Sequence, residues 1–173
     1  MTLDEIKNSL NSNSNLTDDM KDCLMELISI FNAKFPNVDL TNLNERLKTL
    51  QIVRGSKFLI RKSSSYNPIA NEMLVSLVKI DDNIDCRHIL MRELLNIITA
   101  KDNFTGFNKD NAYEALNVGY TEILTNYLVG NEDESEYEDE IVATNMIAEV
   151  VGNDTLFNAY FNNDATLIMN AVY

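Results

Sequence analysis

The chain has 173 residues, of which 45% are hydrophobic and 24% are charged, a composition typical of one soluble globular domain covering residues 1–173. Its formal net charge of −13 and sequence pI near 4.4 argue against binding to nucleic acid or to anionic membrane surfaces, because both require clustered Lys and Arg. No apolar run approaches the roughly 20 residues of a membrane span, the first residues lack a secretion signal, and Cys23 and Cys86 are isolated. We therefore expect a soluble, cytoplasmic protein.

Residues 1–54 are predicted to form a helical N-terminal part. The segment Thr2-Leu3-Asp4-Glu5 fits a capping box at the start of a short helix. Thr17, followed by two aspartates, is expected to cap a second helix. A third helix is expected to follow Thr41.

The next segment is predicted to contain a small antiparallel sheet. Residues 57–62, 66–70 and 73–78 have the composition of extended segments, and Ser63-Ser64-Ser65 is typical of a turn. Pro68 has no amide hydrogen to donate, so its segment should be an edge strand or irregular.

Two long helices are predicted next, one from about residue 85 to 101 and one from about 112 to 128. An acidic cluster at residues 132–140 leads into a further helix, which Gly152 ends. Residues 153–173 are expected to form a helical C-terminus. The fold class is therefore α+β.

The first of the long helices carries one stripe of polar residues. His88, Arg92, Asn96 and Thr99 are spaced four, four and three residues apart, which places them on one side, and Glu93 lies beside them. A zinc peptidase carries His-Glu-x-x-His on a helix of this kind. Here Arg92-Glu93-Leu94-Leu95-Asn96 occupies the same place, with both histidines replaced.

The second long helix carries Leu116-Asn117-Val118-Gly119-Tyr120-Thr121-Glu122, which is similar to the Leu-Asn-Glu-Gly-x-Thr-Glu of small bacterial zincin-like proteins. Val118 stands where that motif has its zinc-binding Glu. The order of strands, motif helix, Thr105-Gly106-Phe107 segment and glutamate-bearing helix is also the zincin order. From about residue 58 to 152 the chain thus resembles the gluzincin-like metallopeptidase superfamily, in a degenerate form. The resemblance implies a zincin-like core within residues 55–152.

The resemblance implies a site without zinc. Arg92 is a permanent cation, Asn96 is a poor zinc ligand, and Val118 cannot bind a metal. Glu93 matches the general base, and Glu122 matches the carboxylate that orients a zinc-binding histidine. We expect no metal, no cofactor and no catalytic residue, so that Glu93 is vestigial.

An arginine at the first ligand position can supply part of the positive charge that a metal would bring. We therefore expect Arg92 to pair with Glu122, with Glu93 or with both. The simpler interpretation of Arg92, Glu93 and Asn96 is the solvent-facing side of an amphipathic helix.

The expected function is that of a pseudo-metallopeptidase which binds a protein or peptide along its sheet edge and cleft. One alternative is an active metal-dependent peptidase that recruits a metal through Glu93, Glu122, His88 or the acidic cluster. Another is a helical interaction module unrelated to zincins.

Overall fold

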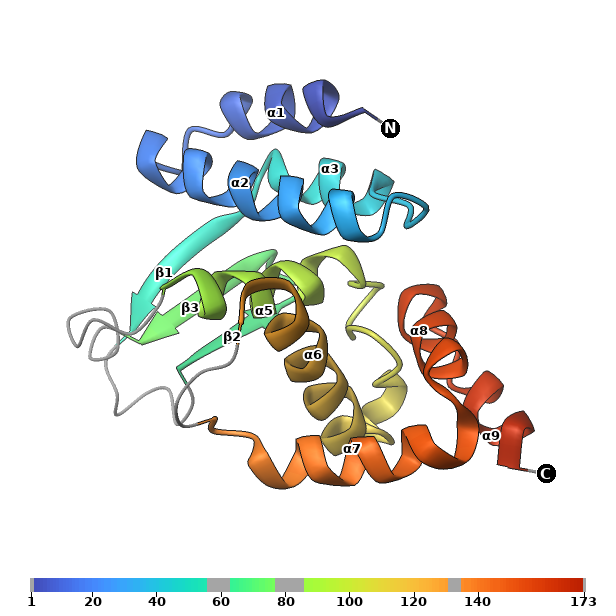
Figure 1. The fold of residues 1–173 in the computed structure, drawn as a ribbon. Coiled ribbons are helices and arrows are strands. Elements are labelled where there is room, and N and C mark those ends of the chain that lie inside the picture. Colours follow the sequence, from blue (N-terminus) through green and yellow to red (C-terminus); the bar gives the residue numbers. More distant parts are fainter. Residues whose placement is uncertain (1, 56–62, 77–85, 131–134, 173) are drawn as a thin grey trace.

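The computed structural model describes residues 2–55, 63–76, 86–130 and 135–172, and Figure 1 shows how their helices surround a small sheet. In chain order the elements are α1 (Leu3–Ser12), α2 (Asp18–Lys34), α3 (Thr41–Leu47), β1 (Gln51–Gly55), β2 (Ser64–Asn67), β3 (Glu72–Ser76), α5 (Cys86–Ile98), the short 3-10 helix η1 (Lys109–Asn111), α6 (Glu114–Val129), α7 (Glu138–Val151), α8 (Asn153–Asn162) and α9 (Thr166–Val172). The fold is α+β and mostly helical. None of the helices in this part of the chain combines the length and the apolar character needed to cross a membrane.

The N-terminal helices begin where the sequence predicts. The capping box is present, because the Thr2 hydroxyl accepts from the Glu5 amide and the Glu5 carboxylate accepts from the Thr2 amide at 2.7 Å. The Thr17 hydroxyl caps α2 by accepting from the Met20 amide at 3.4 Å. The helical part is nevertheless shorter than residues 1–54, because Gln51–Gly55 forms the strand β1. All five residues of Gln51–Gly55 pair with β3. This pairing stabilises a strand that the local sequence favours only weakly.

The sheet is mixed, so the prediction of an antiparallel sheet is wrong. Its described strands lie in the order β1-β3-β2, with β1 parallel and β2 antiparallel to β3. Met73 in β3 is therefore opposite Ile52 on one side and Tyr66 on the other. The parallel pair comes from β1, which the sequence did not predict, whereas the predicted strand at residues 57–62 lies outside the described residues.

Strand β2 lies at one edge of the sheet. It begins at Ser64, inside the predicted turn, and it ends at Asn67. Pro68 follows directly, in agreement with the expectation that its segment is an edge strand or irregular.

Helix α5 runs through the centre of the molecule, in contact with α2 and α3 and also with α6 and β2 (Figure 1). Its fully buried apolar side chains include Leu94, Leu95 and Ile97. The polar stripe is buried as well, since only 4% of Arg92 and 2% of Glu93 are exposed. The interpretation of this stripe as the solvent-facing side of an amphipathic helix is therefore wrong.

The C-terminal helices complete the core on the side of α6. Helices α6 and α7 are in tight contact at Gly119, where a side chain would overlap the Glu140 carbonyl and the Thr144 hydroxyl of α7. Tyr160 of α8 is fully buried and packs edge-on against Tyr120 of α6, with ring centroids 5.3 Å apart. These contacts fix the position of α6 opposite α5.

Candidate functional site

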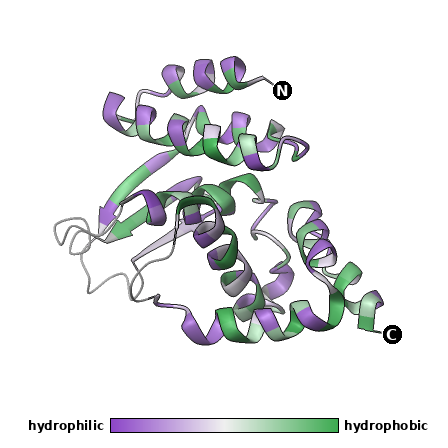
Figure 2. Cartoon of the chain, in the orientation of Figure 1, coloured by the Kyte–Doolittle hydropathy of each residue, from purple (hydrophilic) through white to green (hydrophobic). Residues whose placement is uncertain are grey.

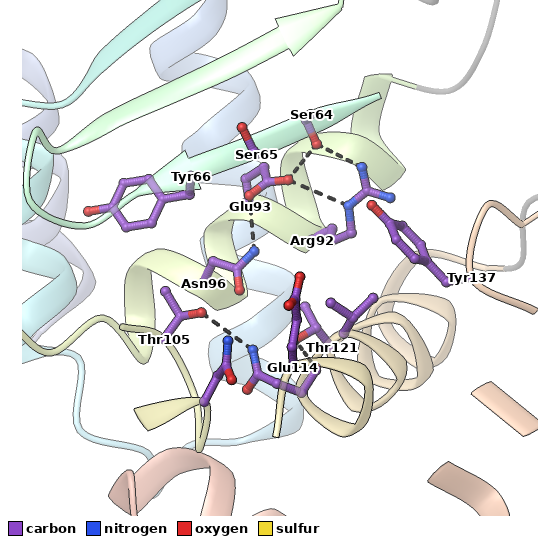
Figure 3. Close-up of a pocket in the computed structure, with 13 residues that line it drawn as sticks. Ser64, Ser65, Tyr66, Arg92, Glu93, Asn96, Thr105, Glu114, Thr121 and Tyr137 are labelled. Atoms are coloured by element: carbon purple, nitrogen blue, oxygen red, sulfur yellow. Dashed lines mark hydrogen bonds and ion pairs between the residues drawn. The ribbon is translucent and has the colours of Figure 1, made fainter. Parts of the chain in front are cut away.

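A cavity of about 210 Å³ is lined by residues of β2, α5 and α6 (Figure 3). The three positions assigned to replaced zinc ligands, Arg92, Asn96 and Val118, all line it. Much of the remaining lining is polar and includes Ser65, Asn108, Glu114, Asn117 and Thr121. The structure thus brings the predicted positions together around one space.

The Arg92 side chain is held by two serine hydroxyls and faces two carboxylates. Its Nη2 donates to Ser63 Oγ and, at 2.7 Å, to Ser64 Oγ. Its Nε lies 3.5 Å from Glu93 Oε1, and its Nη1 lies 3.7 Å from Glu122 Oε2. Arg92 therefore sits between the two glutamates that the sequence singled out, and its direct hydrogen bonds go to the serines.

The serines connect this cation to acidic side chains. The Ser64 hydroxyl accepts from Arg92 and donates to Glu93 Oε1. The Ser63 hydroxyl likewise accepts from Arg92 and donates to Glu136 Oε2 at 3.1 Å. Hydrogen bonds that include charged groups are stronger than neutral ones, so this network favours one arrangement of the Arg92 guanidinium.

The surrounding negative groups keep Arg92 charged despite its burial. Burial alone would lower the pKa of Arg92, but Glu93, the Tyr137 ring, Glu122 and Glu136 together outweigh it, so the pKa is raised. The guanidinium also lies over the Tyr137 ring, 5.0 Å from its centroid. The net effect is a permanent positive charge enclosed between β2, α5, α6 and the start of α7.

Glu93, the position of a general base in the peptidases, makes hydrogen bonds within the protein through both carboxylate oxygens. Oε1 accepts from Ser64, and Oε2 accepts from the Asn96 amide at 3.0 Å. Asn96, which the resemblance aligns with the second histidine of the peptidase motif, thus holds Glu93 in place.

Glu122 is fully buried beneath Arg92 and also lies beside the single histidine of the chain. Its Oε1 is 3.6 Å from His88 Nε2 and accepts from the Ser135 hydroxyl at 3.3 Å. The same His88 nitrogen lies 2.8 Å from Asn126 Oδ1. His88, which is 1% exposed, is thus a buried and hydrogen-bonded residue.

Asn117, one residue of the motif on α6, also has a structural role. Asn117 is 4% exposed, and its Oδ1 accepts from the Phe107 amide at 3.1 Å. This bond ties α6 to the loop that follows α5. Gly106 in that loop has a positive φ of 54°, and any side chain there would overlap Asn117 and Tyr160. The loop therefore sets the distance between α5 and α6 across the cavity.

Sequence reasoning missed several residues of this site. Ser63 and Ser64 were predicted only as part of a turn, although a run of serines before a cation-bearing helix is a usable signal. Tyr137 has no local signal, because its role depends on the fold placing the start of α7 over Arg92.

Within the described residues, no group of three or more His, Cys, Asp or Glu side chains converges in a way that could hold a metal ion. The acidic cluster at residues 132–140 is described only from Ser135 onward, and there Glu136 accepts hydrogen bonds from Ser63. Residues 132–134 lie outside the described part of the chain.

Comparisons of the chain with known protein families, with curated proteins and with solved structures find no match. The resemblance to zinc peptidases accordingly rests on the sequence of α5 and α6.

Proposed function

We propose that this chain is a catalytically inactive, zincin-like protein that binds an extended peptide or protein segment along β2 and the adjoining cavity. The observation that carries the proposal is the buried Arg92 guanidinium, 3.5 Å from Glu93 and 3.7 Å from Glu122. A cation in this position supplies charge of the sign that a metal would supply, and it cannot activate a water molecule as a metal does.

The edge strand supports binding of an extended segment. Among the described strands β2 pairs with β3 on one side only, and an extended peptide can add to such an edge through main-chain hydrogen bonds. Ser64, Ser65 and Tyr66 of β2 line the cavity together with Asn96 and Val118 (Figure 3). A peptide paired with β2 would therefore place alternate side chains toward the cavity.

The loss of metal chemistry is tested by metal analysis of the purified protein and by restoring the ligands. We expect the wild type to contain no stoichiometric zinc. The triple variant R92H/N96H/V118E should bind zinc tightly, and the double variant R92H/N96H should bind it more weakly because it lacks the third ligand. Stoichiometric zinc in the wild type would overturn the proposal, and a triple variant that folds without binding zinc would contradict the zincin-like geometry.

Peptide binding is tested with linear peptides selected from a displayed random library. The variant V118W fills the cavity, so we expect it to weaken binding by at least about tenfold, as the loss of a central contact does. V53W is the matched control, because Val53 is a partly exposed valine on β1, outside the cavity. Equal binding by the wild type and V118W would place the peptides elsewhere and refute the binding site.

A further inference from the structure

Helix α7 presents apolar side chains on its outer face as well as on its inner face. Val142, Met146 and Val150 follow one another at intervals of four residues and are 57%, 68% and 68% exposed. Such spacing places them on one side of the helix. Buried Thr144 and Val151 instead belong to the inner face of the helix.

Helix α7 spans one margin of the molecule in Figure 1, and hydrophobic and hydrophilic residues alternate along it in Figure 2. The neighbouring helix α9, which contacts α7, adds Met169 and Val172 to the exposed apolar residues of this region. Single exposed apolar residues are common on protein surfaces, but a row of three large ones along one helix is typical of an interaction surface.

The net negative charge of the chain comes from residues 110–173, which include α7. Residues 1–109 contain 14 acidic and 14 basic side chains, whereas residues 110–173 contain 13 acidic side chains and no Lys, Arg or His. The whole net charge of −13 therefore belongs to the part of the chain that forms α6 to α9. On α7 itself, exposed Glu138 and Asp139 lie one turn before Val142, and exposed Glu149 directly precedes Val150.

We propose that the outer face of α7 is a docking surface for a basic amphipathic helix of a partner protein. Apolar residues of that helix would cover Val142, Met146 and Val150, and its Lys and Arg side chains would lie against the acidic residues near the two ends of this row. The proposal does not depend on peptide binding at β2.

The negative charge of α7 decides which kind of partner can bind its outer face. A second copy of this chain would place the acidic ends of two α7 helices, neither of which has a basic residue, into one interface. An anionic membrane or a nucleic acid would meet the same repulsion. A helix with an apolar row flanked by Lys and Arg complements both the hydrophobicity and the charge of the surface.

A synthetic helical peptide with Leu at positions i, i+3, i+4 and i+7 and Lys elsewhere is a suitable probe. We expect it to bind the full chain, and we expect a twin with Glu in place of Lys not to bind. The double variant V142A/M146A should weaken binding by about tenfold, since it removes apolar area from the centre of the contact. Raising the salt concentration should also weaken binding, because the flanking charges are exposed.

Two matched control variants test whether the peptide binds this surface specifically or is attracted to the acidic protein in general. I69A removes an apolar side chain that is 78% exposed, and D4N removes an exposed charge from the electrically balanced part of the chain. Neither should change the affinity, whereas E149Q should reduce it.

Three results would overturn the proposal: no binding of the basic peptide, binding that V142A/M146A leaves unchanged, or a dimer of the chain that M146E dissociates. The first two are measured by calorimetric titration and the third by analytical ultracentrifugation.

Discussion

Replacing Arg92 with Met should destabilise the protein by about 3–5 kcal/mol, the usual cost of removing one partner from a buried ionic network. Met keeps much of the apolar stem of Arg92 and removes the charge and the donors. Glu93, 2% exposed, and Glu122, 0% exposed, would then be left without the guanidinium that lies 3.5 Å and 3.7 Å from them.

The distances set the scale of this effect. At the observed separations of 3.5 and 3.7 Å, each carboxylate attracts the guanidinium by about 4–5 kcal/mol at an effective dielectric constant of about 20. Much of that attraction offsets the cost of burying the charges, so the net value of the intact network is small. The variant loses the attraction but still buries the carboxylates, which is why its cost is large.

The assay is equilibrium unfolding in urea, with two comparison variants. R92M/E93Q/E122Q removes the cation together with the charges of the two carboxylates that face it, and it should recover at least half of the loss. R87M breaks the exposed ion pair between Arg87 and Glu26, which are 2.7 Å apart, and should cost no more than about 1 kcal/mol. If R92M costs no more than R87M, or if the triple variant is no more stable than R92M, the assignment of Arg92 as a buried charge partner is refuted.

Two further predictions concern the packing around the site. G119A should destabilise the protein by at least about 2 kcal/mol in thermal unfolding, because the new methyl group overlaps α7, and this overlap outweighs the better helix propensity of Ala. G130A should cost about 1 kcal/mol through its positive φ alone, since in the described part of the chain nothing beyond its sequence neighbours lies within 4 Å of the added carbon, and a larger loss there than at Gly119 would contradict this explanation. Burial raises the pKa of Tyr120, Tyr137 and Tyr160 above the value of about 10 for an exposed tyrosine. The unfolded chain therefore ionises these tyrosines at a lower pH than the folded protein does. The protein should consequently lose stability as the pH rises above about 10. Absorbance titration of the phenolates should therefore show steep ionisation together with the loss of circular dichroism, and gradual ionisation of these tyrosines near pH 10 in the folded protein would refute it.

The helices were the most predictable part of the fold because their signals are local. The caps at Thr2 and Thr17 are hydrogen bonds between residues three positions apart, so the sequence alone shows both partners. Gly130 and Gly152, with φ of 96° and 86°, likewise end α6 and α7 where the sequence predicts.

The sheet was predicted less well because strand pairing depends on residues far apart in the chain. β1 is short and pairs in parallel with β3, and no pattern within Gln51–Gly55 specifies that partner. The composition around Pro68 was informative only about the edge position of its segment.

For the candidate site, the sequence determined which residues belong to one helix face and which type of chemistry they lack. The resemblance to the zinc-peptidase motifs pointed to Arg92, Asn96 and Val118, and all three line the cavity. Only the tertiary structure decided that this polar stripe is buried, because burial depends on the packing of α6 and β2 against α5.

The tertiary structure also decided how the charge of Arg92 is compensated. Its partner Ser63 lies 29 residues earlier in the chain, and the link from Ser63 to Glu136 spans 73 residues. Contacts over such distances are set by the packing of whole elements rather than by local sequence. The same reason applies to the outer face of α7, whose apolar spacing is visible in the sequence but whose exposure only the fold determines.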